Sequence, residues 1–432
     1  MIILYFKKGG HKMYNHNNIN TKKFLICFSL SILIMGVFSF SSLNKTSIFS
    51  KNKSEEASVF TPTKKNVNKA SLLAVGDTMV YNAQLTGQYD VSTAKYNFNN
   101  NFEYVKKYVE DADYSMVNLE TTLTGNKVYR YSSYPKFNSP DELADGLKYA
   151  GFDLISTANN HAYDKGDLSI KNTLATLKDK KLDVIGTREN NGDRYIVKNV
   201  NNIKIGITSY SYGRIINDNK YLNDVKISNE YKNSVNIFDS TSIDKAFNNI
   251  NYTLKKMKDT DLQVVYLHWR DKYSLKENSF QQKLAQKLCD AGVDVIIGSH
   301  PHVVQPVTSI KSADGKHETV VAYSLGNFLS NQTRDQFNQY TEDGLMINID
   351  ISKNNTDEEA KVEKVTCIPT WLNKYYNSKT AKYVYEIIPL ANKSDLDKIN
   401  NLSESKIEKS YKNTAEQVKT SDLISIVENP FD

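Results

Sequence analysis

Short apolar runs alternate with amphipathic segments along most of this 432-residue chain, and this alternation is the feature that most limits its fold. The apolar runs have the length of buried strands, and the segments between them carry apolar residues at helical spacing. Strands are expected at residues 72–75, 114–119, 154–158, 184–185, 203–209, 262–268 and 293–298. Helices are expected at residues 102–110, 140–150, 167–180, 242–258 and 280–291. Strands that alternate with helices in this way predict an α/β fold.

After residue 300 the helical segments stop and apolar runs follow one another in pairs. Residues 303–310 and 319–324 form one pair, and residues 345–351 and 361–368 form the next. This change predicts a second, antiparallel or mixed sheet, and two packed sheets with helices outside would accommodate both halves. We assign residues 70–390 to this domain and residues 391–432 to a peripheral tail of one or two polar helices.

The N-terminal part of the chain has the pattern of a secretion signal. Residues 24–43 form a run of 20 residues without a charge, which is long enough to cross a bilayer. Five lysines precede this run and place the N-terminus in the cytoplasm: Lys7, Lys8, Lys12, Lys22 and Lys23. We therefore expect a cytoplasmic tail at 1–23, a transmembrane signal anchor at 24–43, a flexible stalk at 44–69 and an extracytoplasmic domain in the cell envelope. The alternative is a cleaved signal peptide, because Ser39-Phe40-Ser41 resembles a cleavage site.

The formal charge of +6 comes from the same N-terminal part. The first 53 residues hold eight lysines and no Asp or Glu, so the rest of the chain is close to neutral. A basic face for nucleic acid is therefore not expected. The three cysteines are too few for a disulfide framework, and we interpret Cys289 and Cys367 as small buried side chains, with a disulfide between them left open.

Chemically active side chains stand directly after the predicted strands, at the edge where functional groups of an α/β sheet gather. They are Asp77, Glu120, Asn160, His161, His268, His300, His302 and Asn327. Carboxylate, amide and imidazole ligands together favour borderline divalent ions such as Zn, Mn or Fe, and a shared carboxylate holds two ions about 4 Å apart. In an extended segment, His300 and His302 would point to the same side. We therefore predict a site for divalent metal at this edge.

Several motifs, in order along the chain, resemble one family. They are Ala-Val-Gly-Asp at 74–77, Asn-Leu-Glu at 118–120, Phe-Asn-Ser-Pro at 137–140, Ala-Asn-Asn-His at 158–161, His-Trp at 268–269, Ile-Gly-Ser-His-Pro-His at 297–302 and Tyr-Ser-Leu-Gly-Asn-Phe at 323–328. Across residues 72–332 the chain thereby resembles the capsule-synthesis proteins of CapA type, also called poly-γ-glutamate synthesis accessory proteins. That family is similar to the calcineurin-like metallophosphoesterases.

The resemblance implies a four-layer αββα sandwich, in which two metal ions lie at the strand ends. It implies that Asp77 binds one ion, that Glu120 bridges both, and that Asn160 binds the second. The imidazoles of His268, His300 and His302 would complete the two sites, and His161 matches the residue that protonates a leaving oxygen. For one ion the implied ligands are Asp77, Glu120 and His302, and for the other Glu120, Asn160, His268 and His300.

The chain departs from the family patterns at two places. The phosphoesterase motif Asp-x-His reads Asp77-Thr78-Met79 here, so one ion lacks a ligand and a single tightly held ion would also fit. After His268-Trp269, Arg270 and Lys272 stand beside the expected cleft. They are candidates for binding an anionic substrate or polymer, together with Asn327, and the alternative is that the two cations are solvated loop charges.

Three functions fit these patterns. The first is a membrane-anchored extracytoplasmic protein of capsular poly-γ-glutamate synthesis or export, which would work with a membrane-embedded polyglutamate synthase complex and its anionic polymer. The second is a metal-dependent phosphoesterase of the cell envelope that is unrelated to polyglutamate. The third is a scaffold that has kept the fold without the chemistry.

Overall fold

Two mixed β-sheets and the helices that cover them form the folded part of the chain. The computed structural model describes residues 67–190, 192–355, 359–399 and 401–432. The first sheet has the order β19-β18-β17-β1-β4-β5-β6, with β16 beside β1 and β20 beside β18. The second has the order β10-β9-β8-β12-β13-β15-β14, with β7 and β11 also beside β8. The α/β class predicted from the sequence is confirmed.

The strands of the first sheet are β1 (Val67–Thr78), β4 (Tyr114–Leu119), β5 (Leu154–Ser156), β6 (Asp183–Ile185), β16 (Asn327–Leu329), β17 (Asp343–Asn354), β18 (Lys361–Asn377), β19 (Lys382–Pro389) and β20 (Ile424–Ile426). Those of the second are β7 (Tyr195–Val200), β8 (Ile203–Ile216), β9 (Asn219–Leu222), β10 (Val225–Lys226), β11 (Ile237–Asp239), β12 (Leu262–His268), β13 (Val295–Ser299), β14 (Val304–Lys311) and β15 (Glu318–Leu325). A separate ribbon consists of β2 (Tyr89–Asp90) and β3 (Lys95–Tyr96).

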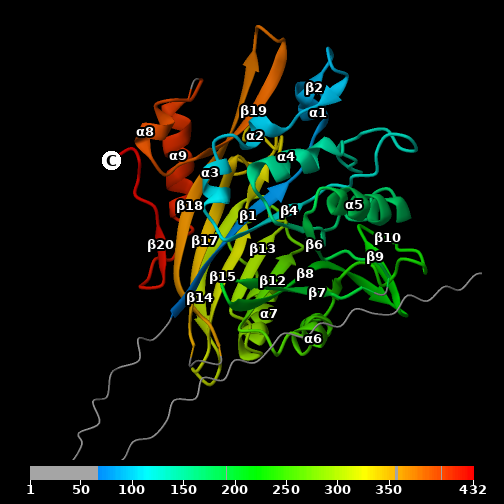
Figure 1. Cartoon of the computed structure of the whole chain (residues 1–432), viewed down its shortest axis with the longest axis vertical. Helices are drawn as coiled ribbons and strands as arrows, with labels where there is room; N and C mark the ends of the chain where they lie inside the picture. The colour runs from blue at the N-terminus through cyan, green and yellow to red at the C-terminus, as the bar shows by residue number, and fades with distance from the viewer. Residues whose placement is uncertain (1–66, 191, 356–358, 400) are drawn as a thin grey trace, which may run out of the picture. The chain divides into compact units, whose positions relative to one another are not determined.

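Helices cover the outer face of each sheet (Figure 1). On the first sheet they are α1 (Asn82–Gln88), α2 (Asn99–Phe102), α3 (Lys106–Glu110), α4 (Glu142–Ala150) and α5 (Asp167–Asp179). On the second they are α6 (Ile243–Leu254) and α7 (Ser279–Asp290). The helix expected at 102–110 is therefore two short helices, α2 and α3, separated by a turn.

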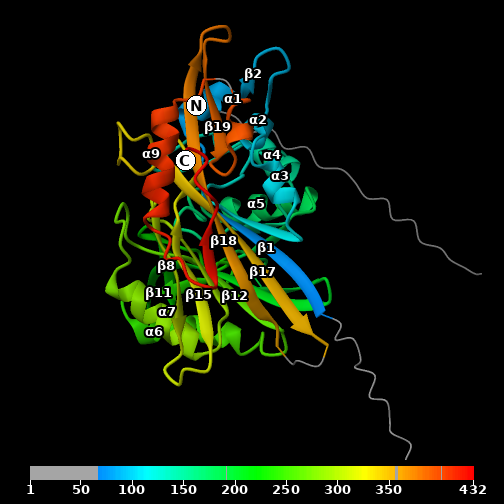
Figure 2. The ribbon, with the colours of Figure 1, turned by 90° about the vertical axis from the view of Figure 1, so that its left-hand side faces the viewer.

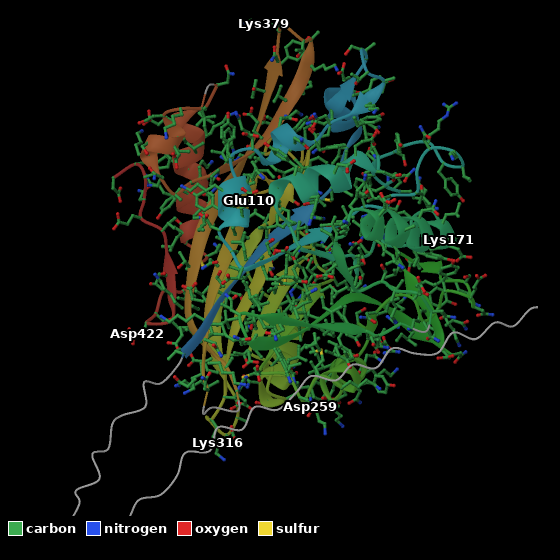
Figure 3. All side chains as sticks on the ribbon, in the orientation of Figure 1. Glu110, Lys171, Asp259, Lys316, Lys379 and Asp422 are labelled. Atoms are coloured by element: carbon green, nitrogen blue, oxygen red, sulfur yellow. The ribbon has the colours of Figure 1, made fainter. Side chains whose placement is uncertain are left out.

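Successive side chains of a strand point to opposite faces of its sheet, and this alternation explains why the sheets are covered by separate cores. In β1, Leu72 and Ala74 belong to a core between the two sheets, whereas Leu73 and Val75 belong to a core beneath the helices of the first sheet. A third core packs α6 and α7 on the second sheet. Strands such as these are buried on both faces, which is why they read as continuous apolar runs. Charged side chains such as Lys171 and Asp259 lie on the outside (Figure 3).

The division of the strands between the sheets differs from the prediction. The second sheet begins at β7 rather than after residue 300, and β17 and β18 return to the first sheet. There β17 pairs antiparallel with β1, so that Leu72 lies opposite Ile349 (Figure 2). An apolar run reports burial but does not name the neighbouring strand, and this is why the partition could not be read from the pattern.

The C-terminal segment is joined to the first sheet. It contains α8 (Lys393–Leu396) and α9 (Glu404–Ala415), as expected, but it also contains β20, which pairs in parallel with β18. Helix α9 buries Ile407 and Tyr411. Ser410 and Asn413 of α9 donate hydrogen bonds to the buried carboxylate of Asp343, which also forms an ion pair with Arg334.

Removal of Arg334 should destabilise this junction strongly. Asp343 is 1% exposed, and burial raises the pKa of its carboxyl to about 6 although Arg334 opposes the rise. In Arg334→Met the Asp343 carboxylate remains buried without its cationic partner. Breaking a buried ion pair in this way typically lowers the free energy of unfolding by about 3–5 kcal/mol. Urea unfolding measures the loss. Adding Asp343→Asn should recover part of it, and Lys393→Met, in an exposed ion pair, should change little. Equal stability of Arg334→Met and the unaltered chain would contradict this account.

Two further expectations concern the membrane anchor and the two cysteines of the folded domain. Within the described ranges, no helix is long and apolar enough to cross a membrane, and residues 1–23, 24–43 and 44–66 lie outside those ranges. The anchor therefore stays a prediction. Cys289 and Cys367 are both buried and free, in agreement with their interpretation as small core side chains.

Candidate metal centre

The predicted site residues come together where strands of both sheets end. Asp77 lies in β1, and Glu120 and Asn160 follow β4 and β5 of the first sheet. His268 ends β12, and His300 and His302 follow β13 of the second sheet. The cluster therefore joins the two sheets at one edge of the sandwich.

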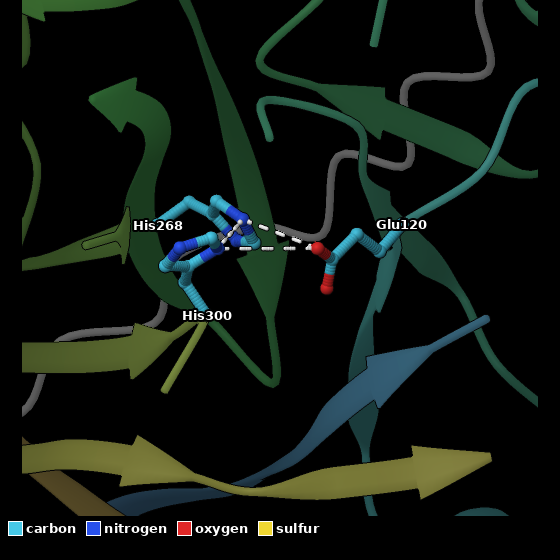
Figure 4. Close-up of side chains that lie close together, drawn as sticks. All are labelled: Glu120, His268 and His300. Atoms are coloured by element: carbon cyan, nitrogen blue, oxygen red, sulfur yellow. Dashed lines mark hydrogen bonds and ion pairs between the residues drawn. The ribbon is translucent and has the colours of Figure 1, made fainter. Parts of the chain in front are cut away.

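Glu120 is shared by two groups of possible metal ligands. One group is Glu120, His268 and His300, and the other is Asp77, Glu120 and His302. Within each group the ligand atoms lie within 4.8 Å of one another, and every member is buried. Asn160 adds to the first group, because its Oδ1 lies 2.7 Å from Nε2 of His268. Figure 4 shows the Glu120 carboxylate facing the rings of His268 and His300.

The polar atoms of this cluster fit a cation. Both carboxylate oxygens of Glu120 are buried and have no hydrogen-bond partner. The nearest nitrogens lie 3.5 Å (His268 Nε2) and 3.9 Å (His302 Nε2) from Glu120 Oε1. A buried carboxylate without partners is costly, and a divalent ion removes that cost. The donor set of imidazole, carboxylate and amide oxygen suits Zn, Mn or Fe.

The backbone after β13 is strained where it delivers two of these ligands. His300 has φ 89° and His302 has φ 58°, in the left-handed region that side chains other than glycine rarely adopt. The sequence suggested an extended segment here, and the positive φ angles show that it is bent. Both rings nevertheless reach the cluster. The N–H of His300 donates to Asp77 Oδ2 at 3.1 Å, which fixes this bend against β1. Such strain is typical of functional sites.

Neighbouring polar groups orient the candidate ligands. Asn118 Nδ2 donates to Asp77 Oδ1 at 2.7 Å, and Ser299 Oγ lies 2.8 Å from His268 Nδ1. The Ser299 contact at Nδ1 holds the His268 ring so that Nε2 faces Asn160 and Glu120 in the cluster. Asn327 Oδ1 lies 3.1 Å from His302 Nδ1. Such contacts fix the orientation and tautomer of metal-binding imidazoles.

His161 lies beside the ligand groups and belongs to neither of them. Its Nδ1 contacts Asp164 Oδ2 at 2.7 Å, and its Nε2 lies 4.0 Å from Glu120 Oε1. Its ring makes a T-shaped contact with Phe137, with centroids 4.7 Å apart. Asp164 is fixed in turn by the N–H of Phe137. The imidazole is therefore held with Nε2 towards the cluster, which is the geometry of a proton donor.

Comparison with known proteins now assigns the chain to a family. The sequence profile described as "Bacterial capsule synthesis protein PGA_cap" matches residues 71–332, more than half of the chain. The chain belongs to this family. All the candidate ligands and His161 lie inside the matched region of this PGA_cap protein.

Two curated relatives are similar over 261 residues, 59% of the chain. The "Capsule biosynthesis protein CapA" of Bacillus anthracis is 28% identical, and the match covers 58% of its length. The "PGA biosynthesis protein CapA" of Bacillus subtilis (strain 168) is 29% identical, and the match covers 62% of its length. The chain thus spans about three fifths of the length of each of these relatives.

The remaining predicted residues of this PGA_cap chain lie in different surroundings. Met79 is buried in a small apolar cluster with Tyr81 and Phe137, so an apolar contact stands where the phosphoesterase motif has a histidine. Arg270 and Lys272 are exposed. Lys272 is near enough to contribute to the low pKa of His300.

Asn327, the candidate for substrate binding, has a buried side chain that contacts neighbouring parts of the chain. Its Nδ2 donates to the carbonyl oxygens of His302 and Thr341, and its Oδ1 faces His302. These contacts favour a role in holding His302.

Sequence reasoning missed the residues that support the ligands. Asp164 follows His161 by three positions, which is a signal that an orienting carboxylate was available. Ser299 and Asn118 stand inside the motifs at 297–302 and 118–120, but nothing in those motifs marks them as supporting residues. Asn223, which contacts Asn160, lies 63 residues away and gives no such signal.

Burial and mutual charge set the protonation states in the cluster. Burial would raise the pKa of the Glu120 carboxyl, but His302, His268 and His161 hold it down at about 2. Burial lowers the pKa of His300 well below its usual value of 6.5, and the neighbouring His268 and His302 lower it further. The arrangement thus favours an ionised Glu120 and a neutral His300, the forms in which both bind metal.

The low pKa of His300 predicts a loss of stability in mild acid. Below pH 6.5 His300 of the unfolded chain takes up a proton, whereas the folded one stays neutral. The unfolded state then binds more protons than the folded state. The free energy of unfolding therefore falls as the pH is lowered, by at most about 1.4 kcal/mol per pH unit for one group. Denaturant unfolding with a chelator at pH 7.5 and 5.5 should show this fall, and His300→Asn should make it shallower. Equal slopes for both proteins would contradict the assignment.

Proposed function

We propose that this PGA_cap protein acts in the synthesis or export of a capsular poly-γ-glutamate, and that its cluster is a metallophosphoesterase-like metal centre. The observation that carries the proposal is the Glu120 carboxylate, which is buried without a hydrogen-bond partner and is shared by the two groups of candidate ligands. A purely structural site would leave this carboxylate unsatisfied. The family match and the names of the two relatives support the role in capsule formation.

The chemistry follows from the surroundings of the cluster. Divalent ions held by Asp77, Glu120, Asn160, His268, His300 and His302 would polarise a phosphoryl oxygen and activate water. His161 donates the N–H of Nδ1 to Asp164, and the carboxylate stabilises the protonated ring. A proton on Nε2 is then available to the oxygen of a leaving group. The reaction class we propose is hydrolysis of a phosphate ester.

The two groups are unequal in their ligands. The group of Glu120, His268 and His300 has Asn160 as a fourth ligand, whereas the group of Asp77, Glu120 and His302 has the apolar Met79 nearby. We therefore propose that one ion binds tightly and the second more weakly.

Metal content and hydrolysis test the centre. The full chain should purify with stoichiometric divalent metal, take up Mn²⁺ or Zn²⁺ in calorimetric titration after chelation, and hydrolyse a generic aryl phosphate. Absence of bound metal, together with no measurable uptake, would show that the cluster is a structural site without metal.

Complementation in a polyglutamate-producing host separates the three functions. Deletion of the gene that encodes this protein should abolish the surface polymer. Reintroducing the unaltered gene should restore the polymer, and reintroducing a gene for the Glu120→Gln variant should not. Full rescue by Glu120→Gln would instead identify a scaffold. Normal polymer after deletion, with hydrolysis retained in vitro, would identify an envelope phosphoesterase unrelated to polyglutamate.

We also propose that residues 24–43 anchor the protein in the membrane beside a polyglutamate synthase complex. Anchoring would raise its effective concentration where the polymer emerges. The protein should then stay with membranes after high salt and carbonate, and protease outside intact, wall-stripped cells should reach the domain. Release from membranes with a new N-terminus near Ser41 would show cleavage of a signal peptide instead.

A further inference from the structure

The Asn160 side chain poses a problem of orientation. An amide has an oxygen that can bind a cation and an NH₂ group that repels one, and the two ends have nearly the same shape. In the structure Oδ1 faces Nε2 of His268 at 2.7 Å, and His300 Nδ1 lies 2.9 Å from the same nitrogen. A rotation of 180° would direct the NH₂ group at this site. Something must hold the oxygen inward.

Asn223 makes two hydrogen bonds to Asn160. Its Nδ2 donates to the main-chain oxygen of Asn160 at 2.9 Å, and its Oδ1 accepts from Asn160 Nδ2 at 3.2 Å. Because Oδ1 of Asn223 accepts only from the NH₂ end, the pair allows one orientation of the Asn160 amide. We infer that Asn223 is a positioning residue, which fixes the oxygen of Asn160 towards the metal; this inference rests on the proposed function of the centre.

Tyr212 connects Asn223, in the turn between β9 and β10, to two further candidate ligands. Its hydroxyl donates to Asn223 Oδ1 at 3.3 Å, and its ring stacks on His268 at 6.3 Å with 8° between the planes. The ring also packs on His300, with centroids 5.0 Å apart. The segment from Tyr212 in β8 to the β9–β10 turn thus supports Asn160, His268 and His300. The ligand His302 is packed by Tyr273 instead.

The support is therefore specific to one of the two groups. Loss of Asn223 should weaken the ion bound by Glu120, Asn160, His268 and His300, and it should leave the ion bound by Asp77, Glu120 and His302. Residues that hold metal ligands in place typically contribute 10–100-fold to metal affinity.

Asn223 lends itself to substitution, because it is exposed and stands in a turn with φ 44°. Asn223→Gly keeps this left-handed backbone and removes both hydrogen bonds. Asn223→Asp keeps the acceptor for Asn160 Nδ2 and loses only the donor. Asp224→Gly is the matched control, since Asp224 has φ 63° in the same turn and pairs with Arg214 on the surface.

The test is calorimetric titration of the metal-free full chain with Mn²⁺. In Asn223→Gly one binding step should weaken 10–100-fold and the other should stay within twofold, whereas Asn223→Asp should lose less and Asp224→Gly should match the unaltered chain. If the unaltered chain binds a single ion, that ion should show the same loss. Unchanged affinities in Asn223→Gly, or equal losses at both steps, would overturn the positioning role while the centre itself stands. Absence of binding to the unaltered chain would instead refute the centre.

Discussion

Glu120→Gln is expected to abolish metal binding at both groups of ligands, the largest effect of any single substitution in this protein. Glu120 is the one residue that both groups share. A neutral amide removes the charge that balances the ions, and it can offer one oxygen in place of two. The loss should therefore exceed the roughly 10–100-fold that a lost supporting contact costs. Elemental analysis of the purified variant should find no stoichiometric metal.

The same substitution should remove a coupling between the two sheets. Ions bound to Asp77 and Glu120 from the first sheet and to histidines from the second would tie the sheets together at this edge. Metal at 100 times its Kd should stabilise the unaltered chain by about 2.7 kcal/mol. Thermal unfolding with and without Mn²⁺ should show this shift for the unaltered chain and for the exposed control Glu428→Gln, and no shift for Glu120→Gln. A shift that persists in Glu120→Gln would place the binding site elsewhere.

Much of the site could be predicted because its residues follow apolar runs. Asp77, Glu120 and His268 each stand at the end of a strand that the local sequence reveals, and parallel strands bring such ends to one edge. The supporting contacts depend on how distant segments meet. The contact of Asn223 with Asn160 requires the fold of the β9–β10 turn, and no feature near either residue announces it.

The fold shows the same division between local and long-range information. The bounds of β4 and β12 agree with the expected strands at 114–119 and 262–268. Strands β9 and β10 were missed because they are polar and short. The turns beside them contain Asn217-Asp218 and Asn223-Asp224, all with positive φ, a pattern typical of two-residue hairpin turns. These two dipeptides were the signal that could have revealed the hairpins.

His161→Asn is expected to lower kcat by about 10²–10⁴-fold while the metal content stays unchanged. The range is that of a lost general acid or base, and His161 belongs to neither ligand group. The effect should depend on the leaving group. The loss of about 10²–10⁴-fold is expected for phenyl phosphate, whose leaving oxygen needs the proton, and a much smaller loss for p-nitrophenyl phosphate, whose phenolate leaves without help.

Asp164→Asn should produce a similar pattern for a different reason. Asp164 contacts Nδ1 of His161 at 2.7 Å, and an amide in its place neither stabilises the protonated ring nor fixes the tautomer. Steady-state kinetics and elemental analysis of both variants, with His317→Asn as the control away from the site, give the comparison. If metal and activity fell together in His161→Asn, with no dependence on the leaving group, His161 would be a metal ligand and the proton donor would have to be sought elsewhere in the cluster.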